Sequence, residues 1–211
     1  MSTELYLIRH GESQMNVNSH LVGGRSNETP LTKHGVRQAQ LLGEYFLANN
    51  ILPTQVFASP AVRTRETAMH TLAAMDFTIE PIIATEIQEM DQGDYVGRLR
   101  SEVYTPEILS EIDRQGKAFK APGGESMNDV GRRMLQWVET NIPLAPQSEI
   151  ERVFVFGHGV AIRTLVATIH DWSRAKTFEA VTDNTSFTLL SNKTQHWQLE
   201  YLGATPHLGQ A

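Results

Sequence analysis

The chain has 211 residues, of which 40% are hydrophobic and 20% are charged, which excludes a disordered or collagen-like protein. Its net charge of −6 argues against a broad surface for nucleic acid or anionic lipid. A small anionic ligand stays compatible with this charge, because a few buried arginines can form a positive pocket inside an acidic protein.

The first predicted element is a buried strand near the amino terminus. Residues 3–8 are rich in aliphatic side chains, which indicates a strand covered on both faces. The strand ends at Arg9-His10-Gly11-Glu12, and a polar loop follows at residues 11–30. Open α/β sheets bind ligands at the carboxyl ends of their strands. We therefore expect Arg9 and His10 at a ligand site, where an imidazole beside a guanidinium suits a phosphoryl group.

Strands and helices alternate along the rest of the chain, the pattern of a mainly parallel sheet covered by helices. Further strands are predicted at residues 55–59, 81–87, 152–156, 186–191 and 196–201, the last two joined by Asn192-Lys193-Thr194. Helices are predicted from Thr32 to about residue 49, at 61–75 after a Ser59-Pro60 cap, at 107–115, after Gly123-Gly124-Glu125-Ser126, and at 160–170.

This pattern predicts one α/β domain over residues 1–211. We expect a single-domain three-layer α/β/α sandwich with a mainly parallel central sheet and a C-terminal antiparallel hairpin. The pattern weakens at about residues 90–122, which carry scattered Gly, Pro and charged residues. We interpret this segment as an excursion from the sheet that covers the site.

Two further places match the chemistry of Arg9 and His10. Gly157-His158-Gly159 follows a buried strand, and the next helix offers its positive amino end to an anion. Arg63 falls in the first turn of a helix that follows a strand, so it can point at the same rim of the sheet.

Taken together, these motifs resemble the histidine phosphatase superfamily, in its phosphoglycerate-mutase-like branch. The matches, in family order, are Arg9-His10-Gly11-Glu12-Ser13 with Asn16, Ser59-Pro60 through Arg63 to Thr67-Ala68, Glu89 within residues 87–93, Pro122-Gly123-Gly124-Glu125-Ser126, and Gly157-His158-Gly159 with Ile162-Arg163. They run from residue 3 to about residue 165, and Asp183-Asn184-Thr185-Ser186 supplies a typical tail. Each motif alone is weak, but five in order are a strong signal.

The resemblance implies the reacting groups. His10 would be the nucleophile that forms a phosphohistidine, with its other ring nitrogen donating to a backbone carbonyl. Glu89 would protonate the leaving alkoxide and then deprotonate the hydrolytic water. Asp91 and Asp94 are rivals for this role, but Glu89 matches the family position.

The resemblance also implies the phosphate ligands. Arg9, Arg63 and His158 would bind the equatorial oxygens of the phosphoryl group, where charge gathers in the transition state. Asn16 would add a neutral donor, and Gly159 would let the backbone approach the phosphate.

We predict a metal-independent phosphomonoesterase that acts on small phosphorylated metabolites. Phosphoglycerate mutases typically carry Glu-Arg-His-Tyr-Gly at the acid and a longer, arginine-rich insertion after it. This chain has Glu89-Met90-Asp91-Gln92-Gly93 and only residues 93–122 before the next motif, which favours a phosphatase. A cofactor-dependent phosphoglycerate mutase is the alternative, and a non-catalytic phospho-ligand binding module is a third. Family phosphatases often carry Glu where Val96 stands, so the role of that loop stays open.

The basic residues around the excursion offer candidates for a second anionic group of the substrate. They are Arg25, Arg98, Arg100, Lys117 and Lys120, and each can instead be a solvated surface charge. The histidines outside the motifs are expected on the surface or in packing: His20, His34, His70, His170, His196 and His207. Arg65 is expected to be solvated, and Arg163 to anchor its helix or form an ion pair.

No cofactor and no metal are expected. Two histidines at strand ends could hold a metal, but the neighbouring arginines would repel it. The chain has no cysteine, its first strand begins almost at Met1, and no apolar run reaches transmembrane length. We expect a cytoplasmic protein without nucleic-acid or membrane partners, and its oligomeric state stays open.

Overall fold

The computed structural model describes residues 3–142, 150–192 and 196–209 as one α/β domain built on a six-stranded sheet of order β3-β2-β4-β1-β5-β6. Its strands are β1 (Thr3–Arg9), β2 (Gln55–Ala58), β3 (Ile82–Ile83), β4 (Glu151–Gly157), β5 (Phe187–Asn192) and β6 (Trp197–Ala204). Strands β3, β2, β4 and β1 run parallel, while β5 and β6 are antiparallel. The predicted sheet and its C-terminal hairpin are confirmed. In the predicted loop, Asn192 ends β5, and Lys193 and Thr194 lie outside the described residues.

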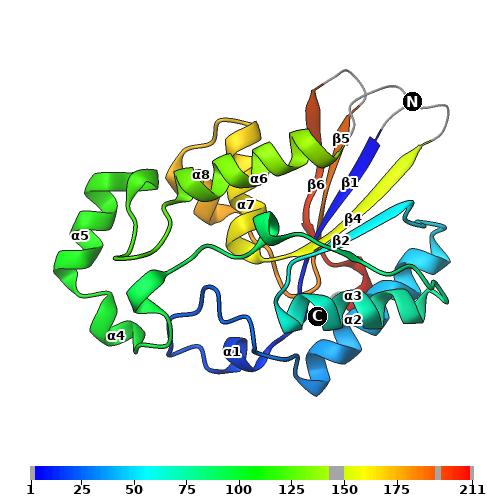
Figure 1. The fold of residues 1–211 in the computed structure, drawn as a ribbon, viewed down its shortest axis with the longest axis horizontal. Coiled ribbons are helices and arrows are strands. Elements are labelled where there is room, and N and C mark those ends of the chain that lie inside the picture. The colour runs from blue at the N-terminus through cyan, green and yellow to red at the C-terminus, as the bar shows by residue number, and fades with distance from the viewer. Residues whose placement is uncertain (1–2, 143–149, 193–195, 210–211) are drawn as a thin grey trace.

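Helices cover both faces of the sheet, as Figure 1 shows. They are α2 (Lys33–Ala48), α3 (Val62–Ala74), α6 (Met127–Asn141) and α7 (Gly159–Ile169). Leu5 and Leu7 of β1 share a core with α6 and α7, whereas Tyr6 and Ile8 share a core with α2 and α3. Successive strand residues point to opposite faces, so a strand between two helical layers needs an apolar residue at nearly every position. The predicted three-layer sandwich is confirmed.

The remaining helices are short and lie mainly at one end of the sheet. They are α1 (Gln14–Val17), α4 (Arg100–Val103), α5 (Pro106–Gln115), α8 (Arg174–Glu179), and the 3₁₀ helices η1 (Thr85–Ile87), η2 (Gly93–Tyr95), η3 (Gly116–Ala118) and η4 (Pro206–Leu208). Helices α4 and α5 stand away from the sheet on the left of Figure 1. In the part of the chain that the structure describes, no helix is long and apolar enough to cross a bilayer.

Two local predictions are wrong. The strand predicted at 81–87 is only Ile82–Ile83, because the chain then turns into η1 to bury Ile87 completely. The predicted Ser59-Pro60 cap is also absent: Ala61 is the N-cap of α3 and caps no amide with its side chain. The Ser59 hydroxyl accepts weakly from the Ala61 N–H, at 3.5 Å, and its shorter hydrogen bond, at 2.9 Å, is to His158.

The carboxyl ends of three parallel strands lie together. Arg9 at the end of β1 pairs with Gly157 at the end of β4, and Ala58 at the end of β2 pairs with Phe156. The residue after each strand end is therefore brought to one edge of the sheet. His10 donates its backbone N–H to the Gly157 carbonyl at 3.1 Å, which continues the pairing past the end of β1.

Candidate active site

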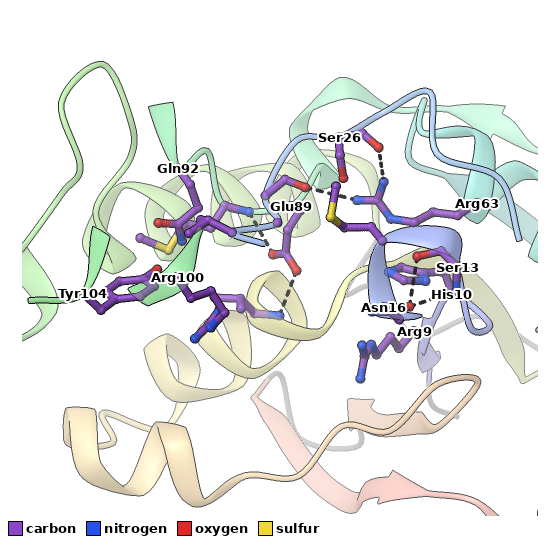
Figure 2. A pocket seen from close by; sticks show the side chains of 16 residues that line it. Arg9, His10, Ser13, Asn16, Ser26, Arg63, Glu89, Gln92, Arg100 and Tyr104 are labelled. Carbon is purple, nitrogen blue, oxygen red and sulfur yellow. Dashed lines mark hydrogen bonds between the residues drawn. The ribbon is translucent and has the colours of Figure 1, made fainter. Parts of the chain in front are cut away.

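A cavity of about 220 Å³ opens at this edge of the sheet. Its walls include Arg9 and His10 after β1, Asn16 from α1, Arg63 from the first turn of α3, and Glu89 after η1. Figure 2 shows these side chains around the cavity. The structure thus brings together five of the residues that the sequence assigned to the site, although they are spread over eighty positions of the chain.

The His10 ring is buried and held in one orientation. Its Nδ1 lies 2.7 Å from the Gly11 carbonyl oxygen, which can only accept, so Nδ1 carries the proton. Burial, together with the positive charges of Arg63 and Arg9, lowers the pKa of His10 well below its ordinary value. The imidazole is therefore neutral at neutral pH, with an unprotonated Nε2. The predicted hydrogen bond to a backbone carbonyl is confirmed.

The backbone holds the guanidinium of Arg63 in place. Its Nη1 donates to the Ser26 carbonyl at 2.6 Å and its Nη2 to the Gly24 carbonyl at 3.3 Å. The side chain is only 3% exposed, and no ion pair with an acid is found for it among the described residues. Its charge is therefore left for a ligand in the cavity.

Arg9 presents a second cation with an unused donor. Its Nη1 donates to the Thr182 carbonyl at 2.6 Å, while its buried Nε has no hydrogen-bond partner in the described part of the chain. A Cβ at Gly159 would lie 3.3 Å from Nε and Cδ of Arg9, so the glycine makes room for this side chain. Buried donors need partners, and an anion in the cavity can supply one here.

His158 lies behind the cavity wall. Its ring centroid is 5.3 Å from that of His10, and the side chain is fully buried. Its Nδ1 accepts from Arg63 Nη2 at 3.1 Å, and its Nε2 therefore donates to the Ser59 hydroxyl at 2.9 Å. In this geometry His158 orients Arg63. Its contact with a phosphate stays a prediction, because a contact would require one of these hydrogen bonds to be exchanged.

Asn16 keeps one end of its amide for a ligand. Its Oδ1 accepts from the backbone N–H and hydroxyl of Ser13, both at 3.0 Å, and from Nδ2 of Asn184 at 3.3 Å. Its Nδ2 is thereby the donor that remains on the cavity side, which suits the neutral phosphate contact expected of it.

Glu89 is seated on the amino end of α7. Its carboxylate accepts from the backbone N–H groups of Met90 at 2.8 Å, Ala161 at 3.0 Å and Val160 at 3.2 Å. A helix amino terminus carries partial positive charge and unpaired N–H groups. The sequence predicted that this helix end receives a substrate anion. In the structure its Val160 and Ala161 amides bind the Glu89 carboxylate.

A network of charged side chains holds the backbone of Glu89. Arg25 and Arg133 both donate to the Glu89 carbonyl, at 3.2 Å and 3.1 Å. Glu125 joins them, with Oε1 at 3.0 Å from Arg25 and 2.8 Å from Arg133. Burial alone would raise the pKa of Glu125, but Arg133, the backbone N–H of Asp91 and the charge of Arg25 bring it below its ordinary value. Arg133 lies outside every motif of the sequence, so no local pattern marks it as part of the site.

Asp91, the rival for the acid role, belongs to the same network. Its Oδ1 accepts from the Gly93 N–H at 2.8 Å, its Oδ2 lies 3.5 Å from Arg25, and it does not line the cavity. Gly93 has a positive φ of 48°, and a Cβ there would lie 2.1 Å from the Pro122 carbonyl oxygen. Asp91 therefore shapes the close contact between the Glu89 loop and the glycine-rich motif.

Of the five candidate basic residues, Arg100 lines the cavity. Arg25 belongs to the network behind Glu89, and Lys117 donates to the Trp172 carbonyl. Arg98 and Lys120 are exposed on the surface. Within residues 3–142, 150–192 and 196–209, no group of three or more His, Cys, Asp or Glu side chains could hold a metal ion.

Residues 5–205 match the family model of the histidine phosphatase superfamily, branch 1. The chain belongs to this superfamily. A 2,3-bisphosphoglycerate-dependent phosphoglycerate mutase from Sinorhizobium fredii is 32% identical over 169 residues, which is 79% of each protein. An enzyme of the same description from Methylobacterium radiotolerans is 29% identical over 180 residues, or 83% of each.

Solved structures share the fold over nearly the whole chain. Bacillus stearothermophilus YhfR is 26% identical, with a TM-score of 0.82 over 98% of this chain and 99% of that one. A phosphoserine phosphatase from Entamoeba histolytica, solved with phosphoserine, is 21% identical and has the same TM-score and coverage. A mycobacterial glucosyl-3-phosphoglycerate phosphatase is 22% identical, with a TM-score of 0.79 over 97% of this chain and 100% of that one. The histidine phosphatase fold is thus confirmed.

Proposed function

We propose that this member of the superfamily hydrolyses phosphomonoesters through a phosphohistidine intermediate on His10. One observation carries the proposal: a buried, neutral imidazole has its Nδ1 hydrogen bonded to the backbone, which leaves Nε2 as a nucleophile in a cavity lined by three arginines. This is the tautomer and the charge state that attack on phosphorus requires.

In the first step, His10 Nε2 attacks phosphorus and the bond to the leaving oxygen breaks. Arg9 and Arg63 stabilise the charge that develops on the equatorial oxygens, and Asn16 Nδ2 adds a neutral donor. Glu89 gives its proton to the leaving oxygen, so that an alcohol departs. Oε1 of Glu89 accepts two amide hydrogen bonds and Oε2 only one, at 3.2 Å, which makes Oε2 the oxygen better able to carry the proton.

In the second step, water attacks the phosphohistidine and the N–P bond breaks. The Glu89 carboxylate, left without its proton by the first step, takes one proton from this water. Inorganic phosphate leaves, and both His10 and Glu89 return to their starting states. Every group in this cycle belongs to the chain or the substrate, so the reaction needs no metal.

A phosphoglycerate mutase is the second candidate, because the two relatives that are about 30% identical are named as phosphoglycerate mutases. Against it stands Met90, which lines the cavity at the position where phosphoglycerate mutases typically carry arginine after the acid. A thioether cannot bind the carboxylate of a phosphoglycerate as a guanidinium does. We therefore place the phosphatase first.

The test is inorganic phosphate release from a panel of phosphomonoesters, including phenyl phosphate and 3-phosphoglycerate, in the presence of EDTA. We expect steady release by the wild-type protein and a loss of at least about 10⁴-fold in His10→Ala, the order seen when a nucleophile is removed. His34→Ala, at an exposed position, is the matched control. Isomerisation of 3-phosphoglycerate without phosphate release would instead establish the mutase.

A further inference from the structure

A second, larger cavity of about 580 Å³ adjoins the first. The two share five residues along their common boundary: Met90, Gln92, Arg100, Tyr104 and Val160. In Figure 2, Glu89 lies between the side chains around His10 and those of Arg100 and Tyr104. A molecule whose phosphoryl group reacts at His10 can therefore extend past the acid into the second cavity, whose volume is in the range of about 300–1,000 Å³ that suits sizeable ligands.

The wall of the second cavity is largely apolar, and some of its large apolar side chains are left partly exposed to solvent. Helix α5 has no buried residue, yet Leu109 and Ile112 of this helix line the cavity. Phe119 and Met127 add to the wall, and Phe178 faces them from α8. Leu109 and Phe178 are each 48% exposed, an unfavourable state for large apolar side chains unless a ligand covers them.

Three arginines line this cavity, and two of them, the exposed Arg100 and the more buried Arg163, form no ion pair in the described part of the chain. The guanidinium of Arg163 lies 4.7 Å from the centre of the Phe178 ring, and that of Arg174 lies 5.1 Å from it. Arg174 pairs with Asp113 at 3.1 Å, but Arg163 forms no ion pair with any residue in the described ranges. The Nε of Arg163 is also buried and has no hydrogen-bond partner among those residues. Of the two roles predicted for Arg163, the ion pair is absent from the described residues, and anchoring of its helix stays a prediction.

We propose that the second cavity binds the leaving group of the substrate, and that this group is a flat apolar body carrying a second anionic group that binds Arg163. The proposal rests on the proposed function, which places the phosphoryl group at His10. Because the two cavities are continuous, one molecule can fill both, and we therefore assign the occupant of the second cavity to the substrate and not to a separate ligand. Aromatic rings and methionine sulfurs favour a flat apolar body, and the unpaired guanidinium requires an anion.

The proposal distinguishes between classes of phosphomonoester. A small polar acid such as 3-phosphoglycerate would leave Leu109, Ile112 and Phe178 in water. An aryl phosphate with a carboxylate on its far ring would cover these side chains and reach Arg163. The shared feature of good substrates is therefore the combination of apolar area and a second negative charge, at a distance that only a large leaving group spans.

The experiment measures kcat/KM for phenyl phosphate, 2-naphthyl phosphate and 6-carboxy-2-naphthyl phosphate. Arg163→Gln should lower kcat/KM for the carboxylated ester by about 10- to 100-fold, the range for a lost hydrogen bond to a charged group, and for 2-naphthyl phosphate only a few-fold. Leu109→Ser should lower it more for 2-naphthyl than for phenyl phosphate. Arg132→Gln is the matched control, because Arg132 is exposed and pairs only with Asp129.

Equal losses of kcat/KM on all three esters in Arg163→Gln would overturn the inference. The inference would also be overturned if Arg163→Gln changed kcat/KM for the carboxylated ester no more than the control Arg132→Gln does. Phenyl phosphate hydrolysis that depends on His10 would then still support the proposed function. If no ester is hydrolysed, calorimetric binding of the three esters to the His10→Ala protein provides the readout. Weaker binding of the carboxylated ester alone, when Arg163→Gln is added, supports the inference, and unchanged binding overturns it.

Discussion

The two cavities differ in how their walls are held. Around His10, side chains are buried and hydrogen bonded to backbone carbonyls, as the contacts of Arg63 with Ser26 and Gly24 illustrate. Around Phe178, the wall comes from short helices with exposed apolar side chains. Stabilising a transition state requires charges that are already in place, whereas a leaving group can be bound by surfaces that differ between relatives. We infer that the first cavity sets the reaction and the second sets the substrate.

The cores behind the two cavities differ in size but not in a clean division: Met90 and Met127 of a large core line the second cavity, and Val22 of a smaller core lines the first. The strand ends at the first cavity are held by the two large hydrophobic cores, one on each face of the sheet. The helical excursion that forms much of the second cavity has a small core of its own, made by Val22, Tyr95, Val103 and Ala121. A change in α4 or α5 therefore need not disturb the strand ends that position His10. Four predictions test this division, from the largest expected effect to the smallest.

Arg63→Ala should give the largest effect, a loss of about 10²- to 10³-fold in kcat together with weaker binding. The variant removes a transition-state charge and also leaves the Nδ1 of His158 without its donor. Steady-state kinetics with phenyl phosphate measures the effect. Arg65→Ala is the matched control, since Arg65 lies two residues further along α3 and is exposed. Similar losses in both variants would remove Arg63 from the proposed mechanism.

Glu89→Gln should reduce kcat by about 10²-fold on esters with poor leaving groups, the low end of the range for a general acid. The loss should be much smaller on p-nitrophenyl phosphate, because nitrophenolate departs without a proton. The ratio of kcat on an ester with a poor leaving group to kcat on p-nitrophenyl phosphate measures proton donation directly. Glu86→Gln, at an exposed position three residues earlier, serves as the control. If both substrates lose the same factor, another group protonates the leaving oxygen.

Glu125→Gln should lower kcat by about 10-fold or more with little change in KM. Glu125 does not line the cavity, but its loss leaves Arg25 and Arg133 without their shared acid and loosens their hold on the Glu89 backbone. The pH profile of kcat should change as well, which a simple loss of stability would not produce. Glu139→Gln, on the exposed face of α6, the helix that follows Glu125, is expected to behave like the wild type. A change confined to KM would contradict the positioning role.

The smallest effect concerns stability in acid. Burial lowers the pKa of His207 to about 4, and its Nε2 hydrogen bonds to Thr185, whose N–H donates to the His10 carbonyl. Between pH 6.5 and 4 the unfolded chain binds more protons at this residue, so the free energy of unfolding falls as the pH falls, by up to about 1.4 kcal/mol per pH unit.

Urea unfolding at several pH values measures this slope. Above pH 6.5 His207 is neutral in both states and contributes no slope. His207→Gln should make the decline below pH 6.5 shallower, while His34→Gln, at an exposed position, should leave it unchanged. A decline that stays equally steep in His207→Gln would assign the acid sensitivity to His10, His158 and His170, whose pKa values are also lowered by burial.

The sequence predicted the fold in most of its parts because the signals for those parts are local. Apolar residues at nearly every position of β1 and β4 indicate strands covered on both faces. Thr32 is the predicted start of α2, and its hydroxyl does accept from the Gly35 N–H at 3.0 Å. The strand predicted at 81–87 is wrong because the aliphatic residues there have different structural roles. Ile82 and Ile83 pair at the sheet edge, whereas Ile87 packs into the core from a 3₁₀ turn.

By itself the sequence determined which residues meet at the strand ends, since parallel strands with motifs at their carboxyl ends must bring His10, Arg63 and His158 to one edge, and the family resemblance added Glu89. Only the tertiary structure decided how these groups are engaged. It seats Glu89 on the amides of α7, turns both ring nitrogens of His158 toward protein partners, and leaves Arg163 unpaired beside Phe178. The physical reason is that the availability of a polar atom depends on which other atoms lie within about 3 Å of it. Those atoms come from distant parts of the chain, so local patterns carry no record of them.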